Sequence, residues 1–149
     1  MQKGKYMKKL YTIILALALC ASLAACGNGS AKNAVIDLGD SERFTQAERQ
    51  AAVECVLRAF RKWDTPCTVQ AVYYDEAGYD AGKEAFYASS FNQGMFGPED
   101  VILLYSDFHT PEGAQAGGFN PDADYTGWKW TLVRDHAKAP WRVIAYGYA

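Results

Sequence analysis

The sequence predicts an α+β domain: one long N-terminal helix packed on a curved antiparallel sheet of about four strands. Three observations predict this class. A clear helix signal begins near residue 45, four strand-like segments follow it, and a short polar link joins the last two of them. A helix followed by an antiparallel meander is typical of α+β domains. The length from residue 44 to residue 149 suits one domain with one hydrophobic core.

The helix is predicted from its start signal and from its apolar periodicity. Thr45-Gln46-Ala47-Glu48 matches a capping box, with Thr45 as the N-cap and Glu48 at the third helical position. Apolar residues then recur at helical spacing and form one stripe: Ala52, Val53, Val56, Leu57, Phe60 and Trp63. Pro66 stops the pattern, because proline cannot continue a helix. The stripe predicts a helix that lies on a sheet.

Four segments with strand patterns follow the helix. They are Cys67 to Asp75, Val101 to Phe108, Trp128 to Arg134 and Trp141 to Tyr148. The second segment is apolar at successive positions, as expected for a strand that is covered on both faces. The third alternates, which places its two tryptophans and Leu132 on one face. The polar link 135–140 suits a hairpin loop.

Three other segments have weaker patterns. Val35-Ile36-Asp37-Leu38 either adds a short strand or docks on the domain, and Ala81 to Phe91 holds either a short helix or irregular structure. The Thr110–Tyr125 loop is rich in glycine and proline, and its length suggests function or mobility.

The first 25 residues have the pattern of a secretory leader. Four lysines precede an apolar run from Leu10 to Ala25, which is shorter than the ~20 residues that a spanning helix needs. Leu23-Ala24-Ala25-Cys26 resembles the lipobox of bacterial lipoproteins, which implies cleavage before Cys26 and attachment of diacylglycerol to its sulfur. An ordinary cleaved signal with an incidental cysteine is the alternative. We expect a lipid anchor at Cys26 that holds the protein on the extracytoplasmic face of the cell membrane.

The domain organisation and the charge follow from this leader. We expect a lipoprotein signal peptide over 1–25, a flexible tether over 26–43 and a single α+β domain over 44–149. The full chain has 17 acidic and 15 basic residues, and removal of the leader takes away four lysines, which leaves 17 against 11 and a net charge of −6. Phosphate backbones repel such a domain, so we expect no nucleic-acid partner.

The helix and strand segments together carry a family resemblance. The matching stretches are Cys67-Thr68-Val69, Tyr73-Tyr74-Asp75-Glu76, VILLYSDF at 101–108, YTGWKWTLVR at 125–134, and Trp141-Arg142-Val143-Ile144 with Gly147-Tyr148. They resemble an uncharacterised family of small Gram-positive bacterial lipoproteins, and the YxGWxWxLVR run is the most specific piece. The resemblance implies a cystatin-like or nuclear-transport-factor-like fold at the cell envelope. It supplies no catalytic residue, and folds of this kind host enzymes and binding modules alike.

The cysteines, the histidines and the acidic loop predict no metal and no cofactor. Cys55 and Cys67 remain in the domain, and the rise of the helix separates them, which favours two buried thiols over a disulfide. The loop Asp122 to Gly127 partly imitates a calcium loop, but Val133 stands where a bidentate glutamate is needed. Neither histidine has a patterned partner for zinc.

A weak enzyme hypothesis rests on Asp107 and His109. Two residues apart on a strand, they share a face, and a carboxylate beside an imidazole can orient a general base. Asp75 and Glu76, at the end of the first strand, could add a second acid. The opposing interpretation is that polar residues simply end a strand in solvent. We favour this second interpretation, because an isolated Asp-x-His pair is a weak signal of catalysis.

The binding hypothesis rests on aromatic residues. The tryptophans of the last two strands are expected in the core, while Tyr73, Tyr74 and Tyr148 are expected to be exposed and to form a recognition surface. We therefore expect a non-enzymatic binding or accessory module at the cell envelope, whose partner is an envelope protein, a peptide or a small ligand. The alternative is a small pocket enzyme of the same fold that uses Asp107 and His109.

Overall fold

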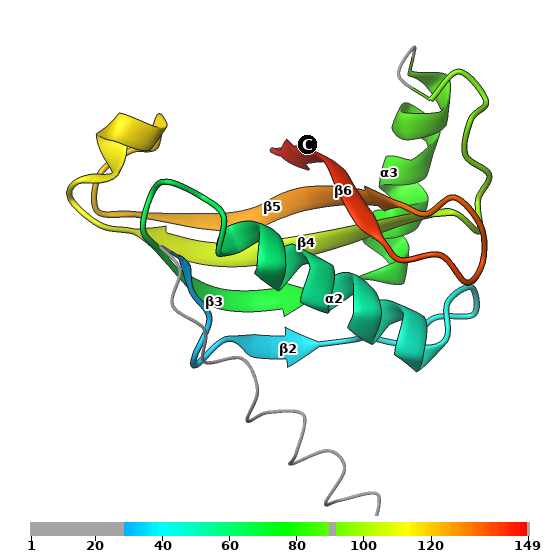
Figure 1. Ribbon diagram of the computed structural model, residues 1–149, viewed down its shortest axis with the longest axis horizontal. Helices are drawn as coiled ribbons and strands as arrows, with labels where there is room; N and C mark the ends of the chain where they lie inside the picture. Colours follow the sequence, from blue (N-terminus) through cyan, green and yellow to red (C-terminus); the bar gives the residue numbers. More distant parts are fainter. Residues whose placement is uncertain (1–28, 90–91, 149) are drawn as a thin grey trace, which may run out of the picture.

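The computed structural model describes residues 29–89 and 92–148, and these residues confirm the α+β class (Figure 1). The elements, in chain order, are β1 (Gly29–Ser30), β2 (Val35–Asp37), α2 (Gln46–Phe60), β3 (Cys67–Tyr73), α3 (Glu76–Ala88), β4 (Val101–Thr110), the 3-10 turn η1 (Ala114–Gly117), β5 (Ala123–Val133) and β6 (Arg142–Gly147). The leader and Cys26 lie outside the described residues.

The described strands form one mixed sheet of six strands, whereas the sequence predicts about four antiparallel ones. β3, β4, β5 and β6 are antiparallel neighbours and overlap the four predicted strands, but β5 begins at Ala123, five residues before its predicted start, inside the segment expected to be a loop. β1 is an addition, and β2 is the short strand that is one of the two alternatives predicted for Val35 to Leu38; both pair with β3 in parallel, with Gly29 opposite Cys67 and Val35 opposite Ala71. Part of the segment expected to be a tether therefore belongs to the sheet. Its pairing satisfies backbone groups on the outer edge of β3.

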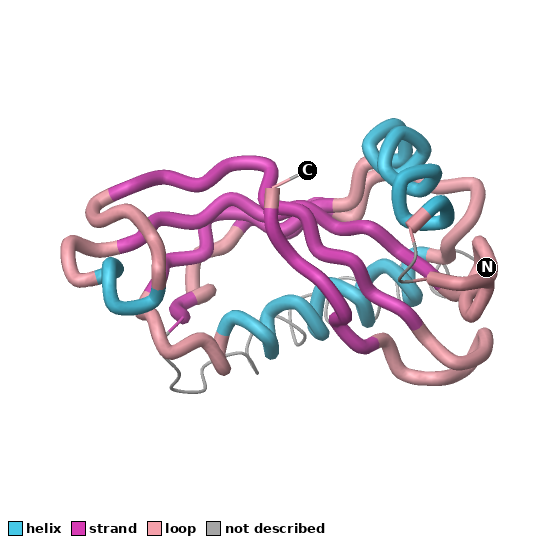
Figure 2. Tube along the Cα trace, turned by 90° about the horizontal axis from the view of Figure 1, so that it is seen from above, coloured by secondary structure: helices cyan, strands magenta, loops and turns pink. Residues whose placement is uncertain are grey.

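Helices α2 and α3 cover opposite faces of the sheet (Figure 2). On the face under α2, Trp130 of β5 packs against Phe60, with ring centroids 4.8 Å apart. On the other face, α3 lies so close to β4 that a Cβ on Gly82 would be 2.7 Å from Leu103 Cδ1. β4 is thus covered on both sides, as its apolar pattern predicts, and residues 101–104 are buried.

Helix α3 is longer than predicted and begins earlier. The sequence pattern leaves a short helix or irregular structure at Ala81 to Phe91, but the helix occupies Glu76–Ala88. Asp75 is its N-cap, since the carboxylate accepts a hydrogen bond from Gly78 N at 2.9 Å. The preceding strand consequently ends at Tyr73, two residues before its predicted end.

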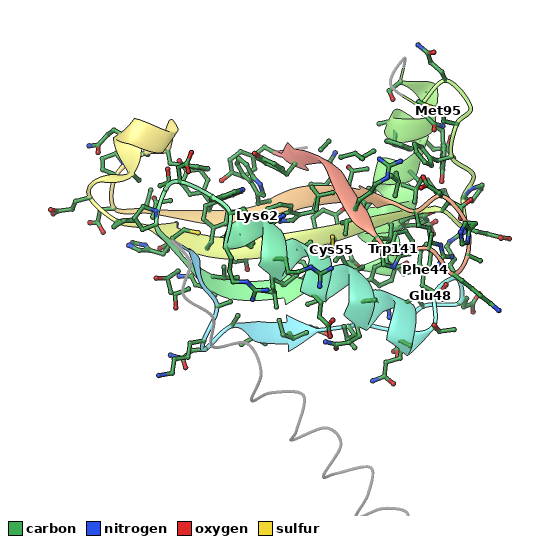
Figure 3. The ribbon with its side chains drawn as sticks, viewed as in Figure 1. Phe44, Glu48, Cys55, Lys62, Met95 and Trp141 are labelled. Carbon is green, nitrogen blue, oxygen red and sulfur yellow. The ribbon has the colours of Figure 1, made fainter. Side chains whose placement is uncertain are left out.

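A buried ion pair holds the N-terminus of α2, next to the predicted capping box. Glu48 accepts hydrogen bonds from Thr45 N at 2.8 Å and from Arg134 Nη1 at 2.6 Å. Arg134 is 4% exposed, donates to Glu99 O at 2.6 Å, and has its Cζ 4.5 Å from the ring centroid of Trp141. Trp141 Nε1 in turn donates to Glu48 O at 3.1 Å (Figure 3). The starts of α2 and β6 and the end of β5 are thus joined at one point.

Cys55 and Cys67 are free, buried thiols, as the helix geometry predicts. Cys55 Sγ donates to Trp141 O at 3.2 Å. Burial raises the pKa of Cys67 to about 11, so this thiol stays protonated at neutral pH.

Glu48→Gln is expected to destabilise the fold by about 2 kcal/mol at neutral pH, because a charged hydrogen bond to buried Arg134 is lost. Partial burial raises the pKa of Glu48, but hydrogen bonds from Arg134 and Thr45 outweigh it, and the pKa lies below the usual 4.5. The stabilisation is thus present above pH 4.5 and is lost as the pH falls through the lower pKa of the folded state. Urea unfolding of both proteins at neutral and at acidic pH measures the effect.

Asp135→Asn is the matched control for this substitution. Asp135 pairs with Arg142 at 3.1 Å, but its side chain is 71% exposed, so we expect a loss below about 1 kcal/mol. Equal losses in the two variants would contradict the role of the Arg134 pair. A Glu48→Gln deficit that stays the same in acid would also contradict it.

Candidate functional site

The structure gives Asp107 and His109 separate partners. Asp107 Oδ1 accepts a hydrogen bond from Gly127 N at 2.8 Å. His109 lies between two aspartates, with Nδ1 3.0 Å from Asp124 Oδ1 and Nε2 3.4 Å from Asp122 Oδ1. These contacts hold the β4–β5 hairpin, and none of them joins the Asp107 carboxylate to the imidazole. The described residues therefore do not assemble the general-base pair that the spacing suggests.

The other two candidate acids are also engaged by the fold. Asp75 caps α3, and Glu76 accepts hydrogen bonds from the Tyr74 hydroxyl and, at 2.8 Å, from Ser41 Oγ. Across residues 29–89 and 92–148, no group of three or more His, Cys, Asp or Glu side chains could hold a metal ion.

The three tyrosines expected on one recognition surface do not gather there. Tyr74 is 3% exposed, so the expectation that it faces solvent is wrong. The chain turns inward after β3 and packs this ring among the aromatic residues near the start of α2. Tyr73 is half-buried and stacks on Tyr105 at 5.8 Å, on the face of the sheet that carries α3. Tyr148 is 59% exposed, and its ring centroid lies 5.2 Å from that of Trp128.

A groove lined by aromatic side chains lies where α2 ends. We call it the aromatic groove; its volume is about 490 Å³, and its lining residues are Lys62–Thr65, Gly117–Phe119, Trp128 and Tyr146. The segment after α2, the end of η1, and strands β5 and β6 build its walls. Small-molecule sites commonly have volumes of roughly 300–1,000 Å³, so the groove is large enough for a ligand.

Trp63 forms the centre of the groove wall. Its ring centroid lies 5.3 Å from that of Phe119 and 5.5 Å from that of Tyr146. Trp130 stacks against it at 5.5 Å, with the ring planes 24° apart. Trp130 is fully buried, as predicted, whereas Trp63, Phe119 and Trp128 are half-buried and Tyr146 is 54% exposed. The groove therefore offers partly open ring faces on a packed aromatic base.

The groove also has polar groups of two kinds. Lys62 and Asp64, both exposed, place opposite charges at its rim. Trp128 contributes an indole Nε1 that is buried and has no hydrogen-bond partner among the described residues. By contrast, Trp130 Nε1 donates to Ser106 Oγ at 2.8 Å. A buried donor without an acceptor costs free energy, and an acceptor atom that reached it would remove that cost.

The loop side of the groove depends on Gly117. A Cβ at this position would lie 1.4 Å from Thr65 Oγ1, so only glycine lets the η1 turn pack against the segment after α2. Gly118 follows with φ of 82°, in the left-handed region that favours glycine. Together they bring Phe119 into the groove. Periodicity gives no sign of Phe119, because it lies in a loop, but the preceding glycine pair marks a close approach of two chain segments.

A second groove of about 390 Å³ lies on the opposite face of the sheet, between α3 and β6. Its lining is mainly apolar and includes Phe86 of α3, Leu103 and Ala145, with Lys129 as its charged side chain. The aromatic groove is the better candidate site of the two, because it combines open ring faces, charges of both signs and an unpartnered buried donor.

Gly117→Ala is expected to destabilise the fold and to displace the loop side of the aromatic groove, because the added methyl group overlaps Thr65. The usual cost of such overpacking is about 1–3 kcal/mol. Gly113→Ala is the matched control, since a Cβ there meets nothing within 4 Å. Thermal unfolding and tryptophan fluorescence of the two variants measure the effect. Equal melting temperatures for the two variants would contradict the close packing of Gly117 against Thr65.

Comparison with known proteins adds no constraint on the site. No family model, no curated protein and no solved structure matches the chain. In the part of the chain that the structure describes, no helix combines the length and apolar character that crossing a membrane requires. The aromatic groove and the leader pattern are therefore the observations on which a function can rest.

Proposed function

We propose that this chain is a lipid-anchored binding module on the extracytoplasmic face of a bacterial cell membrane, and that the aromatic groove is its ligand site. The groove is the observation that carries this proposal. Its volume of about 490 Å³ and its partly open rings suit an amphipathic ligand, whose apolar face packs on an aromatic ring. The partners are the membrane, through Cys26, and a ligand of the cell envelope.

The proposed cellular location rests on the leader sequence, residues 1–25. Four lysines, an apolar run and the Leu23–Cys26 motif stand in the order that lipoprotein export requires. Diacylglycerol on Cys26 would provide two acyl chains, and two chains give stable attachment where one is marginal. The acidic mature chain gains no attraction from anionic lipids, so the anchor must supply the attachment.

We also propose kinship with the small Gram-positive lipoproteins that the sequence resembles, and with the cystatin-like or nuclear-transport-factor-like fold. The support is the outline of the domain, in which α2 lies across the antiparallel strands β3 to β6. The parallel strands β1 and β2 and the helix α3 are additions to that outline.

A binding role is favoured over catalysis. Asp107 and His109 are not lining residues of the aromatic groove, and each is bonded to the β4–β5 hairpin. The alternative of a small pocket enzyme that uses this pair therefore receives no support from their contacts.

Cys26→Ala is expected to abolish lipid attachment. In a Gram-positive host fed with labelled palmitate, the unchanged protein takes up label and sediments with membranes, whereas the variant takes up none. Cys20→Ala is the matched control, because Cys20 leaves with the leader and should not affect the anchor. Label on the Cys26→Ala variant, or no label on the unchanged protein, would contradict the proposed anchor.

Tyr146→Ala is expected to remove ligand binding at the aromatic groove. A thermal-shift screen of the lipidated protein in detergent, with saccharides, short peptides and aromatic acids, should find compounds that raise the melting temperature. The variant should lose this rise, because the Tyr146 ring is 54% exposed in the groove. Because Tyr146 also lines the second groove, Phe86→Ala, which alters that groove alone, is the matched control and should keep the rise. A rise that survives Tyr146→Ala would locate the ligand elsewhere.

A further inference from the structure

We propose that the aromatic groove faces the membrane and binds the neutral saccharide head group of a membrane glycolipid. The inference rests on the proposed anchor at Cys26 and names the ligand class of the proposed binding role. Three observations carry it: the short chain between the anchor and the groove, the balance of charge at the rim, and the unpartnered donor of Trp128.

The position of the anchor limits the distance between the groove and the bilayer. Cys26 and Gly29 are three residues apart, and that length of chain spans at most about 11 Å. Gly29 pairs with Cys67 across about 5 Å of sheet, and Thr65 of the groove stands two residues before Cys67. Thr65 therefore lies within roughly 25 Å of the lipidated residue by any path that the intervening chain takes.

The groove lies at the anchored end of the molecule. In Figure 1, the blue start of the described chain, the end of α2 and η1 share one end, and α3 lies at the other. Figure 3 shows Lys62 toward the first end and Met95 at the second. β4 and β5 are 10 and 11 residues long, so about 30 Å of sheet separates the two ends. A ligand carried on the bilayer is therefore presented to the groove end.

The lining fits a neutral saccharide. A pyranose ring has apolar C–H faces and hydroxyl groups around its edge, so its face can pack on Trp63 or Tyr146 while the hydroxyls reach the rim. Lys62 can donate a hydrogen bond there, and the opposite charges of Lys62 and Asp64 leave the rim without a net charge. The net charge of −6 on the mature chain disfavours an anionic head group.

Trp128 points to a polar ligand independently. Its Nε1 is buried without a hydrogen-bond partner among the described residues, although its side chain lines the groove. Trp130 and Trp141 both donate to oxygen atoms of the protein. A saccharide oxygen could accept from this donor after the indole ring turns toward the groove, whereas an acyl chain has no acceptor. The unpartnered donor therefore favours the head group over the lipid tail.

The test uses the lipidated protein in phosphatidylcholine vesicles, with increasing fractions of a dihexosyl diacylglycerol. Tryptophan emission and its quenching by acrylamide report on the groove, because Trp63 and Trp128 line it. We expect the glycolipid to change the emission saturably and to reduce the quenching. The free disaccharide should need at least about tenfold higher concentration, since anchoring protein and ligand to one surface raises the effective concentration.

Three variants make the test specific. Tyr146→Ala should abolish the glycolipid-dependent change, and Met95→Ala, which alters an exposed side chain at the opposite end, should keep it. The melting temperature of each variant confirms that it is folded before it is compared. Lys62→Ala, at an exposed rim position, should weaken the glycolipid response while leaving the melting temperature unchanged.

Several results would overturn the inference. Vesicles without glycolipid could give the same response, the free disaccharide could act as well as the glycolipid, or the response could survive Tyr146→Ala. If a non-saccharide compound binds through Tyr146 while the glycolipid does not, the inference fails and the proposed function stands. If neither the glycolipid nor any screened compound binds at the groove, both fail.

Discussion

The buried guanidinium of Arg134 is the group on which the rest of the structure depends. It lies where the starts of α2 and β6 meet the end of β5, and it pairs with Glu48 and with Asp100. Without Glu48 the buried guanidinium would lose its closer carboxylate and keep only Asp100, 3.5 Å from Nε, and the loss of a charged partner by a buried group is costly. The same carboxylate closes the capping box of α2. One side chain thus starts the helix and fixes its position on the sheet.

A helix fixed at its first turn also determines where the site can form. α2 has 15 residues and is about 22 Å long, whereas the 11 residues of β5 extend over about 36 Å. The sheet therefore continues past the end of the helix, and α2 does not cover the aromatic side chains on that part of the sheet. The η1 turn, held close by Gly117, covers part of this surface. The aromatic groove is the part of this surface that neither α2 nor the η1 turn covers.

Sequence patterns predicted the parts of the fold that neighbouring residues decide. The capping box at Thr45 and the approximate positions of β3, β4 and β6 depend on local spacing, and the structure has them, whereas β5 begins at Ala123, before its predicted start. The parallel pairing of β1 and β2 depends on a distant strand, and the start of α3 depends on the Asp75 cap. The groove itself was not predictable from periodicity, because Trp63 looks like the end of a core stripe and Phe119 lies in a distant loop.

The two reduced cysteines in the interior have a consequence for biogenesis. Under the proposed export, the chain would expose Cys55 and Cys67 to an oxidising surrounding until it folds. Completed folding ends that exposure, and the raised pKa of Cys67 removes the thiolate that oxidants attack. Under the same proposal, the yield of folded protein depends on whether the core forms faster than the two thiols are wrongly cross-linked.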